Sequence, residues 1–450
     1  MKFTSTGGRV PPAPLEEALH RGLAPDGGLY MPEALPVLPP SVLKDLPGRD
    51  WPNLASAVTR ALFGTALDHD LLESITAEAL NFPLPMVQLK ERLFVLELFR
   101  GPTLAFKDVG ARFMARLLAH FRKPADPLIT ILTATSGDTG GAVAHAFHGL
   151  SGTRVVILFP DGRVTPRQER QFSTLGGNVT AVAVQGDFDD CQRLAKEAFR
   201  EETRSEGRRS SKADPSTVGA GVPVLTSANS INVGRFLPQT TYFLEAWARL
   251  QELHKNRTSI LFTVPSGNFG NLAAGLLAKA MGMTGVSYLA ATNENDVVPE
   301  FLRTGRLTRR PSIPTLSTAM DVGSPSNLDR ILHLYPGGPG TLRKDLVGRK
   351  ITDAQTRACI RRVHRETGYI LDPHSAVGFA ALEEEMKTRP EVTGVLLATA
   401  HPAKFAEVVE PIVEEELPIP LELSRCMGAE RAVVHLEPRL EALKELLQDL

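Results

Sequence analysis

One lysine and two glycine-rich loops are the residues of this 450-residue sequence whose types and spacing could carry out chemistry. Lys107 follows the apolar segment TLAF and opens an expected helix. Burial and the positive end of a helix both disfavour the ammonium form of a lysine. A lysine whose pKa is lowered in this way can form a Schiff base and later transfer protons. The alternative is a solvated surface lysine, the usual state of this residue type.

The loop SGNFGN (Ser266–Asn271) has the setting of an anion-binding turn. It follows the strand-like run SILFTVP and precedes the helical segment NLAAGLLAKAMG. Gly267 and Gly270 allow close backbone approach, and the N–H groups at the start of the next helix favour a bound dianion. The loop matches neither a P-loop nor the GxGxxG dinucleotide fingerprint. An ordinary strand-to-helix turn is the alternative.

The loop TSGDTGG (Thr135–Gly141) has the same setting, between LITILTAT and GAVAHAFHGL. The hydroxyls of Thr135, Ser136 and Thr139 could donate to a second anion. A capped helix start, with Asp138 or Ser136 as the N-cap, is the alternative interpretation. An amine and two anion sites on one scaffold are what pyridoxal phosphate (PLP) chemistry on a phosphorylated substrate would need.

Other polar clusters follow apolar runs, and loop structure explains each of them equally well. NSINVGR (229–235) and NENDVVPEF (293–301) are typical of loop and capping segments. Thr399 ends the run GVLLAT, and a strand-end turn followed by a helix start accounts for His401 and Lys404. The three cysteines are widely separated and form no CxxC pair, so we expect neither a disulfide framework nor a metal site.

The elements that must position these residues alternate between strands and helices from about residue 90. RLFVLELF (92–99) predicts a buried strand, and the spacing of apolar residues over 106–121 predicts an amphipathic helix. Further strand-like runs are LITILTAT, RVVILFP, NVTAVAV, SILFTVPS, VSYLAAT and GVLLATA. Such runs separated by helices predict mostly parallel sheets. Open sheets of this kind bind ligands at the carboxyl ends of their strands, where both glycine loops lie.

Two segments have different patterns. Residues 1–85 are rich in proline and short helical patterns, with a helix expected within 46–64 and no long alternating-strand signal. Residues 203–223 are polar, rich in glycine and serine and aperiodic, which predicts an exposed loop or insertion.

Composition is that of an ordinary globular protein and excludes several classes. Hydrophobic residues make up 42% and charged residues 22%, and the formal net charge is −1. No global attraction to nucleic acid or to an anionic membrane follows from this charge. No apolar run approaches the roughly 20 residues that span a bilayer, and the first residues lack the apolar region of a secretory signal. We therefore expect a cytoplasmic protein with no nucleic-acid or membrane partner.

With these residues in place, the sequence resembles the threonine synthase family, PLP enzymes of fold type II that are similar to the tryptophan synthase β chain. The resemblance covers most of the chain and rests on PDGGLYMP, GPTLAFKD, ATSGDTGGA, SANSIN, VPSGNFGN, TNENDVVPEF, STAMDVGSPSN, LDPHSAVG and TAHPAKF. It implies an α/β protein with two open, mostly parallel sheet domains flanked by helices and an N-terminal extension. The expected division is an N-terminal region (1–85), a large PLP-binding domain (86–125 with 236–450) and a small mobile domain (126–235).

The resemblance also implies roles for particular residues. Lys107 would hold PLP as a Schiff base and act as a proton shuttle. Thr399 would face the pyridine nitrogen, and Asp138 would lie near the ring O3′. The cofactor phosphate would be bound by five successive residues: Gly267, Asn268, Phe269, Gly270 and Asn271. Candidates for the substrate's phosphate and carboxylate are Thr135, Ser136, Thr139 and Asn232.

The implied activity is the conversion of O-phospho-L-homoserine and water to L-threonine and phosphate by a monomer. The chain departs from the family pattern at Arg100, where histidine is common, at Val233, where tryptophan is common, and in the length of 203–221. Three alternatives remain open: a phospho-lyase that gives 2-oxobutyrate, ammonia and phosphate, a serine/threonine dehydratase, and a non-catalytic protein that binds a phosphorylated metabolite. Placement of water at the substrate's Cβ separates the synthase from the phospho-lyase.

Overall fold

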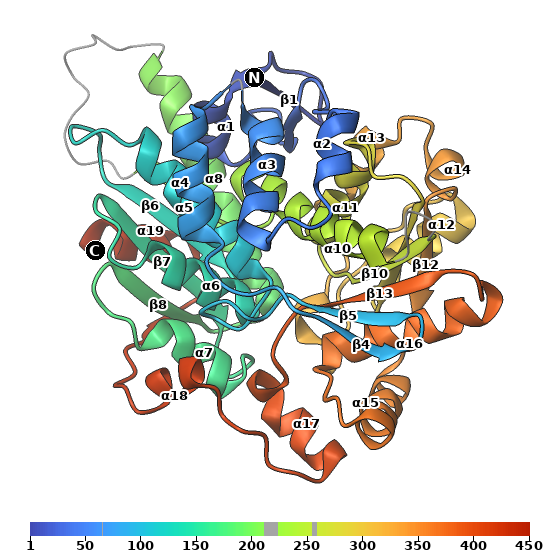
Figure 1. Cartoon of the computed structure of the whole chain (residues 1–450). Coiled ribbons are helices and arrows are strands. Elements are labelled where there is room, and N and C mark those ends of the chain that lie inside the picture. The colour runs from blue at the N-terminus through green and yellow to red at the C-terminus, as the bar shows by residue number, and fades with distance from the viewer. Residues whose placement is uncertain (65, 211–223, 254–258) are drawn as a thin grey trace.

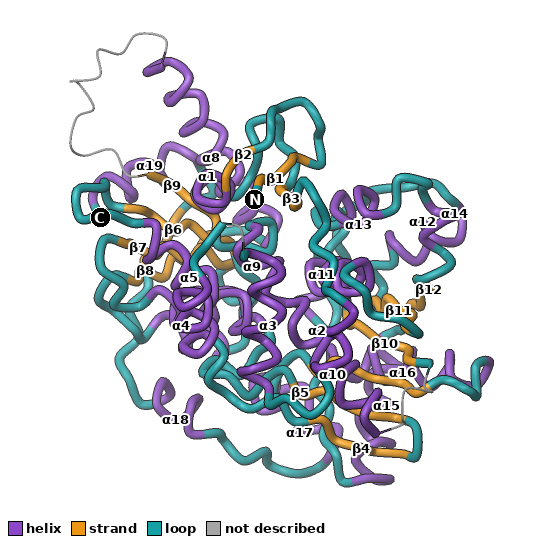
Figure 2. The backbone as a smooth tube through the Cα atoms, turned by 45° about the horizontal axis from the view of Figure 1, so that its top comes forward, coloured by secondary structure: helices purple, strands orange, loops and turns teal. Residues whose placement is uncertain are grey.

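The structure of this protein, a computed structural model, describes residues 1–64, 66–210, 224–253 and 259–450. Within these residues, two mostly parallel sheets occupy opposite sides of the molecule, and a small antiparallel sheet lies near the N-terminus (Figure 1). The tube view shows the strands of the two larger sheets as separate groups with helices between and around them (Figure 2). This is the α/β arrangement that the sequence predicts: two open, mostly parallel sheets flanked by helices, with an N-terminal extension.

The larger sheet has six strands among the described residues. Their order is β12 (Leu346–Lys350), β11 (Val286–Thr292), β10 (Ile260–Pro265), β13 (Thr393–Ala398), β5 (Leu93–Glu97) and β4 (Met86–Lys90), and the β4–β5 pair alone is antiparallel. Phe262 of β10 packs in the same core cluster as residues of α10 (Thr240–Leu253) and α11 (Gly270–Ala280). Leu261 faces the opposite way and joins residues of α16 (Pro373–Thr388). Because both faces are covered, β10 and β13 are buried along their whole length and mostly apolar.

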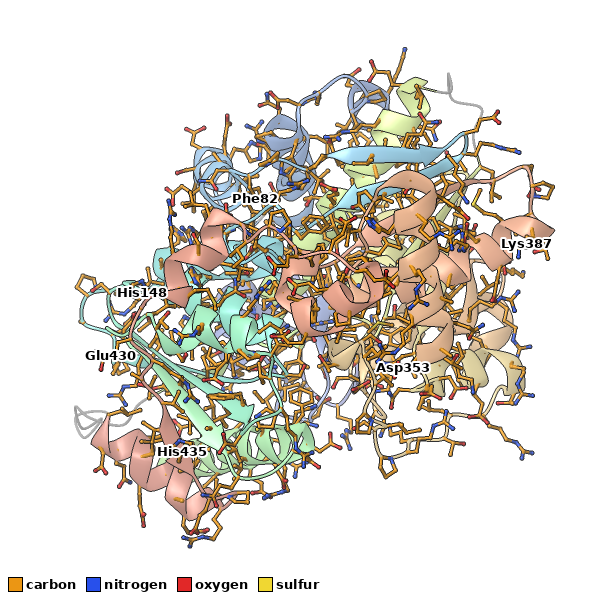
Figure 3. All side chains as sticks on the ribbon, turned by 90° about the horizontal axis from the view of Figure 1, so that it is seen from below. Phe82, His148, Asp353, Lys387, Glu430 and His435 are labelled. Atoms are coloured by element: carbon orange, nitrogen blue, oxygen red, sulfur yellow. The ribbon has the colours of Figure 1, made fainter. Side chains whose placement is uncertain are left out.

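The second sheet has five parallel strands in the described residues. Their order is β14 (Val434–Leu436), β8 (Val179–Val184), β7 (Thr153–Pro160), β6 (Ile129–Ala134) and β9 (Val224–Ser227). One face packs against α8 (Phe188–Ser210) and α19 (Leu440–Asp449). The other packs against α6 (Asp138–Phe147), which lies beside α5 (Lys107–Phe121). In Figure 3, His148, Glu430 and His435 mark this half of the molecule, and Asp353 and Lys387 mark the half with the larger sheet.

The N-terminal extension is a short antiparallel sheet followed by helices. The strands β1 (Lys2–Ser5), β2 (Ala13–Pro14) and β3 (Tyr30–Pro32) pair in the order β2-β1-β3. The helices are α1 (Leu15–Arg21), α2 (Pro40–Asp45), α3 (Trp51–Phe63) and α4 (His69–Ala79). The α3 helix begins where predicted, because the Asp50 carboxylate accepts a hydrogen bond from the N–H of Asn53 and caps it.

The other helices connect these layers. Those of the described residues are α7 (Pro166–Ser173), α9 (Val233–Phe236), η2 (Leu237–Gln239), α12 (Val297–Thr304), η3 (Thr318–Met320), α13 (Leu328–Leu334), α14 (Pro339–Leu342), α15 (Asp353–Thr367), η4 (Pro402–Phe405), α17 (Ala406–Val413) and α18 (Leu421–Met427). No helix in the part of the chain that the structure describes is both long enough and apolar enough to cross a membrane.

The predicted strand runs all form strands, at β5, β6, β7, β8, β10, β11 and β13. The expectation for 203–223 is wrong in its first part, because α8 continues as a helix to Ser210. Residues 211–223 lie outside the described residues. The short pairings of the N-terminal sheet carry no sequence signal, because strands of two to four residues are too brief to show alternation.

The division into three domains stays a proposal, and the C-terminal segment does not follow the proposed boundary. The large domain was expected to include all of 236–450, whereas β14 pairs with β8 of the other sheet. Figure 1 shows α19, in red, beside the strands of that sheet. The chain therefore returns to the second sheet near its C-terminal end.

Candidate active site

A cavity of about 120 Å³ lies where the two parallel sheets face each other. Its walls come from the residues that follow β6, β9, β10 and β13, together with the first turn of α5. The structure brings together in these walls most of the predicted site residues: Lys107, Ser136, Asp138, Thr139, Gly267, Asn268, Phe269, Gly270, Asn271 and Thr399. Residues about 300 positions apart in the sequence thus share one cavity.

Lys107 is placed by hydrogen bonds between two distant segments. The N–H of Phe106 donates to the carbonyl oxygen of Thr399 at 2.9 Å, and the N–H of His401 donates to that of Leu104 at 3.1 Å. These bonds hold the residues before α5 against the end of β13. Lys107, the first residue of α5, therefore lies beside Thr399 in the cavity wall.

The surroundings of Lys107 make it easier to deprotonate than a solvated lysine. Its side chain is 13% exposed, and Nζ lies 3.9 Å from Asp138 Oδ2. Burial lowers the pKa of Lys107 to about 8; the Asp138 carboxylate opposes this shift, and the charges of Arg235 and Lys404 add to it. A lysine with an accessible neutral amine is a nucleophile and a base.

Asp138 is a buried and ionised carboxylate. Its Oδ1 lies 2.6 Å from Lys404 Nζ and accepts a hydrogen bond from Gln168 Nε2 at 2.8 Å. Burial favours the neutral acid, but the ammonium groups of Lys404 and Lys107 outweigh burial and hold the pKa of Asp138 well below its usual range. The carboxylate thus faces the cavity between two lysines.

The loop at 266–271 is shaped as an anion cradle. Phe269 has a left-handed backbone (φ 61°) and directly precedes α11, so the chain turns sharply into the helix. The side chain of Asn268 fixes the turn: its Nδ2 donates to Ser230 Oγ at 2.7 Å, and its Oδ1 accepts from the N–H of Ser326 at 2.6 Å. Within the described part of the chain, no group accepts a hydrogen bond from the backbone N–H groups of 267–270.

This set of groups fits pyridoxal phosphate. The cofactor needs an amine for its aldehyde, and Lys107 provides a buried one. It needs donors for its phosphate, and the unpaired N–H groups at the start of α11 are such donors. Thr399, which is uncharged and 6% exposed, lies in the same wall. Its hydroxyl could form a hydrogen bond with the ring nitrogen of the cofactor.

Thr135 and Asn232 lie behind the wall, and neither lines the cavity. The hydroxyl of Thr135 accepts hydrogen bonds from the N–H groups of Gly137 (2.9 Å) and Gly140 (2.8 Å). The amide of Asn232 donates to the carbonyl oxygen of Leu19 at 2.8 Å and caps α9. Both side chains therefore support the loops that carry the cavity, and their substrate contacts stay predictions.

Three further residues at the site were not predicted. Arg235 lines the cavity, is 3% exposed, and forms no ion pair within the described residues. His374 also lines it and accepts a hydrogen bond from the N–H of Ala319, while its other ring nitrogen faces Asp372 at 2.7 Å. Lys404 is fully buried beneath Asp138. All three lie in sequence motifs described above: NSINVGR, LDPHSAVG and TAHPAKF. The motifs could have drawn attention to these residues, but only the folded structure shows which motif residues lie at the cavity.

Comparison with known proteins agrees with this geometry. A family described as "Pyridoxal-phosphate dependent enzyme" matches residues 79–399, "Threonine synthase N terminus" matches 2–80, and "Threonine synthase, C-terminal" matches 375–447. Threonine synthase of Escherichia coli is 41% identical over 96% of this chain and 96% of its own length.

Solved structures of threonine synthases share the whole fold. That of the E. coli enzyme has a TM-score of 0.90 at 39% identity, with all of both chains covered. PLP-bound threonine synthase from Brucella melitensis has a TM-score of 0.88 at 35% identity and is covered over 99% of its length by all of this chain.

Fold and site together define a PLP-dependent enzyme of fold type II. Within that class, the chain belongs to the threonine synthase family, and it is a lyase with pyridoxal phosphate as its cofactor. The roles of individual site residues stay predictions, as do the monomeric state and the cytoplasmic location.

We expect Gly267→Ala to weaken cofactor binding by about tenfold or more, because a Cβ at 267 would lie 2.6 Å from the carbonyl oxygen of Ala319 and 2.7 Å from Met320 Cα. Backbone atoms cannot move aside as a flexible side chain can. The measurement is titration of the full-length chain with PLP, followed by absorbance. Gly340→Ala is the matched control, since its Cβ would meet no atom within 4 Å. Equal PLP affinity in both variants would contradict the assignment of this loop.

Proposed function

We propose that this chain converts O-phospho-L-homoserine and water to L-threonine and phosphate. The observation that carries the proposal is a second set of groups able to bind an anion, in the same cavity as the 266–271 loop. It consists of the Arg235 guanidinium, the Ser136 and Thr139 hydroxyls and the start of α6. A cofactor phosphate occupies one anion site, so a second site calls for a substrate that carries its own phosphate or carboxylate.

Arg235 supports this proposal most directly. One nitrogen, Nη1, donates to the carbonyl oxygen of Ala228 at 2.7 Å, whereas the buried Nε has no partner. Burial lowers the pKa of Arg235 to about 10, and the Asp108 carboxylate opposes this only in part. A buried cation without a counter-ion is costly. A substrate anion would offset that cost, and the planar guanidinium fits either phosphate or carboxylate oxygens.

The residues of the cavity divide the work of the reaction. PLP, when bound, supplies an electron sink that makes protons on neighbouring substrate carbons removable. The neutral amine of Lys107 removes the proton from the substrate's Cα, releases it again, and is then able to remove a proton from Cβ. Arg235, Ser136 and Thr139 hold the phosphate as it leaves from Cγ, so that its developing charge meets donors already in place. Cγ gains a proton after the phosphate has left, water adds its hydroxyl to Cβ, and Lys107 returns a proton to Cα, which gives threonine.

The remaining residues hold this arrangement. The loop 267–271 would hold the cofactor phosphate, and Asp138 would lie near the ring oxygen. Thr399 would meet the ring nitrogen with a neutral hydroxyl, which would temper the electron sink compared with a carboxylate there. The phospho-lyase alternative would use the same residues and differ only in the fate of the intermediate at Cβ.

The product formed from O-phospho-L-homoserine tests the reaction. We expect the purified, PLP-loaded chain to release L-threonine and phosphate in equal amounts, measured by amino-acid analysis and a phosphate assay. Release of phosphate with 2-oxobutyrate and ammonia would identify the phospho-lyase instead. No phosphate release would contradict the proposed substrate.

Replacement of Arg235 tests the second anion site. We expect Arg235→Gln to raise the KM for O-phospho-L-homoserine by roughly tenfold to a hundredfold, since a charge-assisted hydrogen bond contributes about 1.5–3 kcal/mol. Arg235→Lys should recover part of the loss, because the charge remains but the paired donors do not. Arg389→Gln is the control: Arg389 follows the C-terminal end of α16, whereas His374 near its start lines the cavity. An unchanged KM in Arg235→Gln would overturn the assignment.

A further inference from the structure

A single carboxylate is shared between the fully buried Lys404 and the partly buried Lys107 at the edge of the cavity. Oδ1 of Asp138 lies 2.6 Å from Lys404 Nζ, and Oδ2 lies 3.9 Å from Lys107 Nζ. The contact with Lys404 is therefore the closer one by more than 1 Å. Lys107 carries out chemistry in the proposed reaction, whereas Lys404 does not line the cavity and touches neither cofactor nor substrate position.

Lys404 is held in place on every side. It is fully buried, and its Nζ also donates to the carbonyl oxygen of Thr103 at 2.7 Å. Its own carbonyl oxygen accepts a hydrogen bond from Thr165 Oγ1 at 3.0 Å. Because η4 is packed against α7 by these bonds, Lys404 cannot swing away from Asp138 without breaking several contacts at once.

We propose that Lys404 is a positioning residue that neutralises Asp138 and thereby keeps this carboxylate from holding Lys107 as an ammonium ion. The inference rests on the proposed role of Lys107 as nucleophile and base. A free carboxylate beside Lys107 would stabilise its charged form, and a charged lysine can neither attack an aldehyde nor accept a proton. A carboxylate already paired with Lys404 has less effect.

The other charged groups around the pair act in known directions. Arg235 from α9 faces Lys107 and disfavours its ammonium, as Lys404 does, while Asp138 favours it. His374 from α16 also faces Asp138. Loss of Lys404 would remove one positive charge that disfavours the ammonium form of Lys107. It would also leave the Asp138 carboxylate without its nearer partner, so that this carboxylate stabilises the Lys107 ammonium more strongly. Both changes raise the pH at which Lys107 loses its proton.

The test measures the titration of Lys107 itself. The full-length chain, freed of PLP, is labelled with a limiting amount of acetic anhydride at a series of pH values, and acetylation of each lysine is quantified by peptide mass spectrometry. The wild-type midpoint for Lys107 is expected near 8. Lys404→Met should raise it by about one pH unit or more. An unchanged midpoint in a folded variant would overturn the proposal.

Lys279→Met is the matched control. Lys279 also pairs with one carboxylate, Asp345, at 2.8 Å, but lies at the far end of α11 from the cavity. Loss of this ion pair should leave the Lys107 midpoint where it is. A shift as large as that in Lys404→Met would show that any lost lysine has the same effect, and would also overturn the proposal.

Asp138→Asn separates action through the carboxylate from other effects. It should lower the Lys107 midpoint, and adding Lys404→Met in the double variant Asp138→Asn/Lys404→Met should raise that midpoint by clearly less than Lys404→Met raises it in the wild-type chain, because the carboxylate through which Lys404 acts is no longer charged. An equal rise in both backgrounds would contradict the proposal. The double variant removes both partners of the Asp138–Lys404 pair, so neither is left buried without the other, and it can be measured even if Lys404→Met does not fold. A midpoint in Asp138→Asn that is not below wild type contradicts the proposal. Since no cofactor or substrate is present, the outcome is independent of which product the enzyme forms.

Discussion

Parallel pairing of strands fixes where the chemistry of this protein can take place. A connection between two parallel strands must carry the chain back from the end of one strand to the start of the next, and here most of these connections contain a helix. The carboxyl ends of the strands and the N-termini of the following helices therefore gather at one edge of each sheet. The two sheets present these edges to the same cavity, so α6 and α11 both begin there. Two anion sites and the start of α5 follow from that single arrangement.

The charge balance of the cavity depends on burial as much as on which residues are present. Lys107, Arg235 and Lys404 are cations in close proximity, and Asp138 is the carboxylate that faces two of them. In water such charges would be screened, but in a buried site each alters the protonation of the others. The site therefore carries an excess of positive charge suited to an anionic cofactor and an anionic substrate, although the net charge of the whole chain is −1.

Local patterns in the sequence were sufficient for the layers and for the residues at strand ends. The seven runs formed strands because parallel strands that are covered on both faces are mostly apolar. Lys107 and both glycine loops lie directly after or beside these strands. The end of the chain was not predictable in this way. The short β14 has two exposed residues and no alternation, and its pairing with β8 depends on a partner some 250 residues away.

The same limit applies within the site. The polar residues of TSGDTGG were equivalent in sequence, but the fold turns Thr135 inward to hold Gly137 and Gly140, and leaves Ser136 and Thr139 in the wall. Lys404 was judged an ordinary turn residue, and the helix start was correct, since His401 caps η4. What the pattern could not show is that the Lys404 ammonium would be buried against the carboxylate of Asp138, at the start of α6.

The account depends above all on Lys107 being the lysine that carries the cofactor. Borohydride reduction of the PLP-loaded, full-length chain, followed by digestion and mass spectrometry, fixes the cofactor to the lysine that holds it. The account predicts a pyridoxyl group on the peptide that contains Lys107. Attachment to Lys404, the other lysine buried at this site, would contradict it.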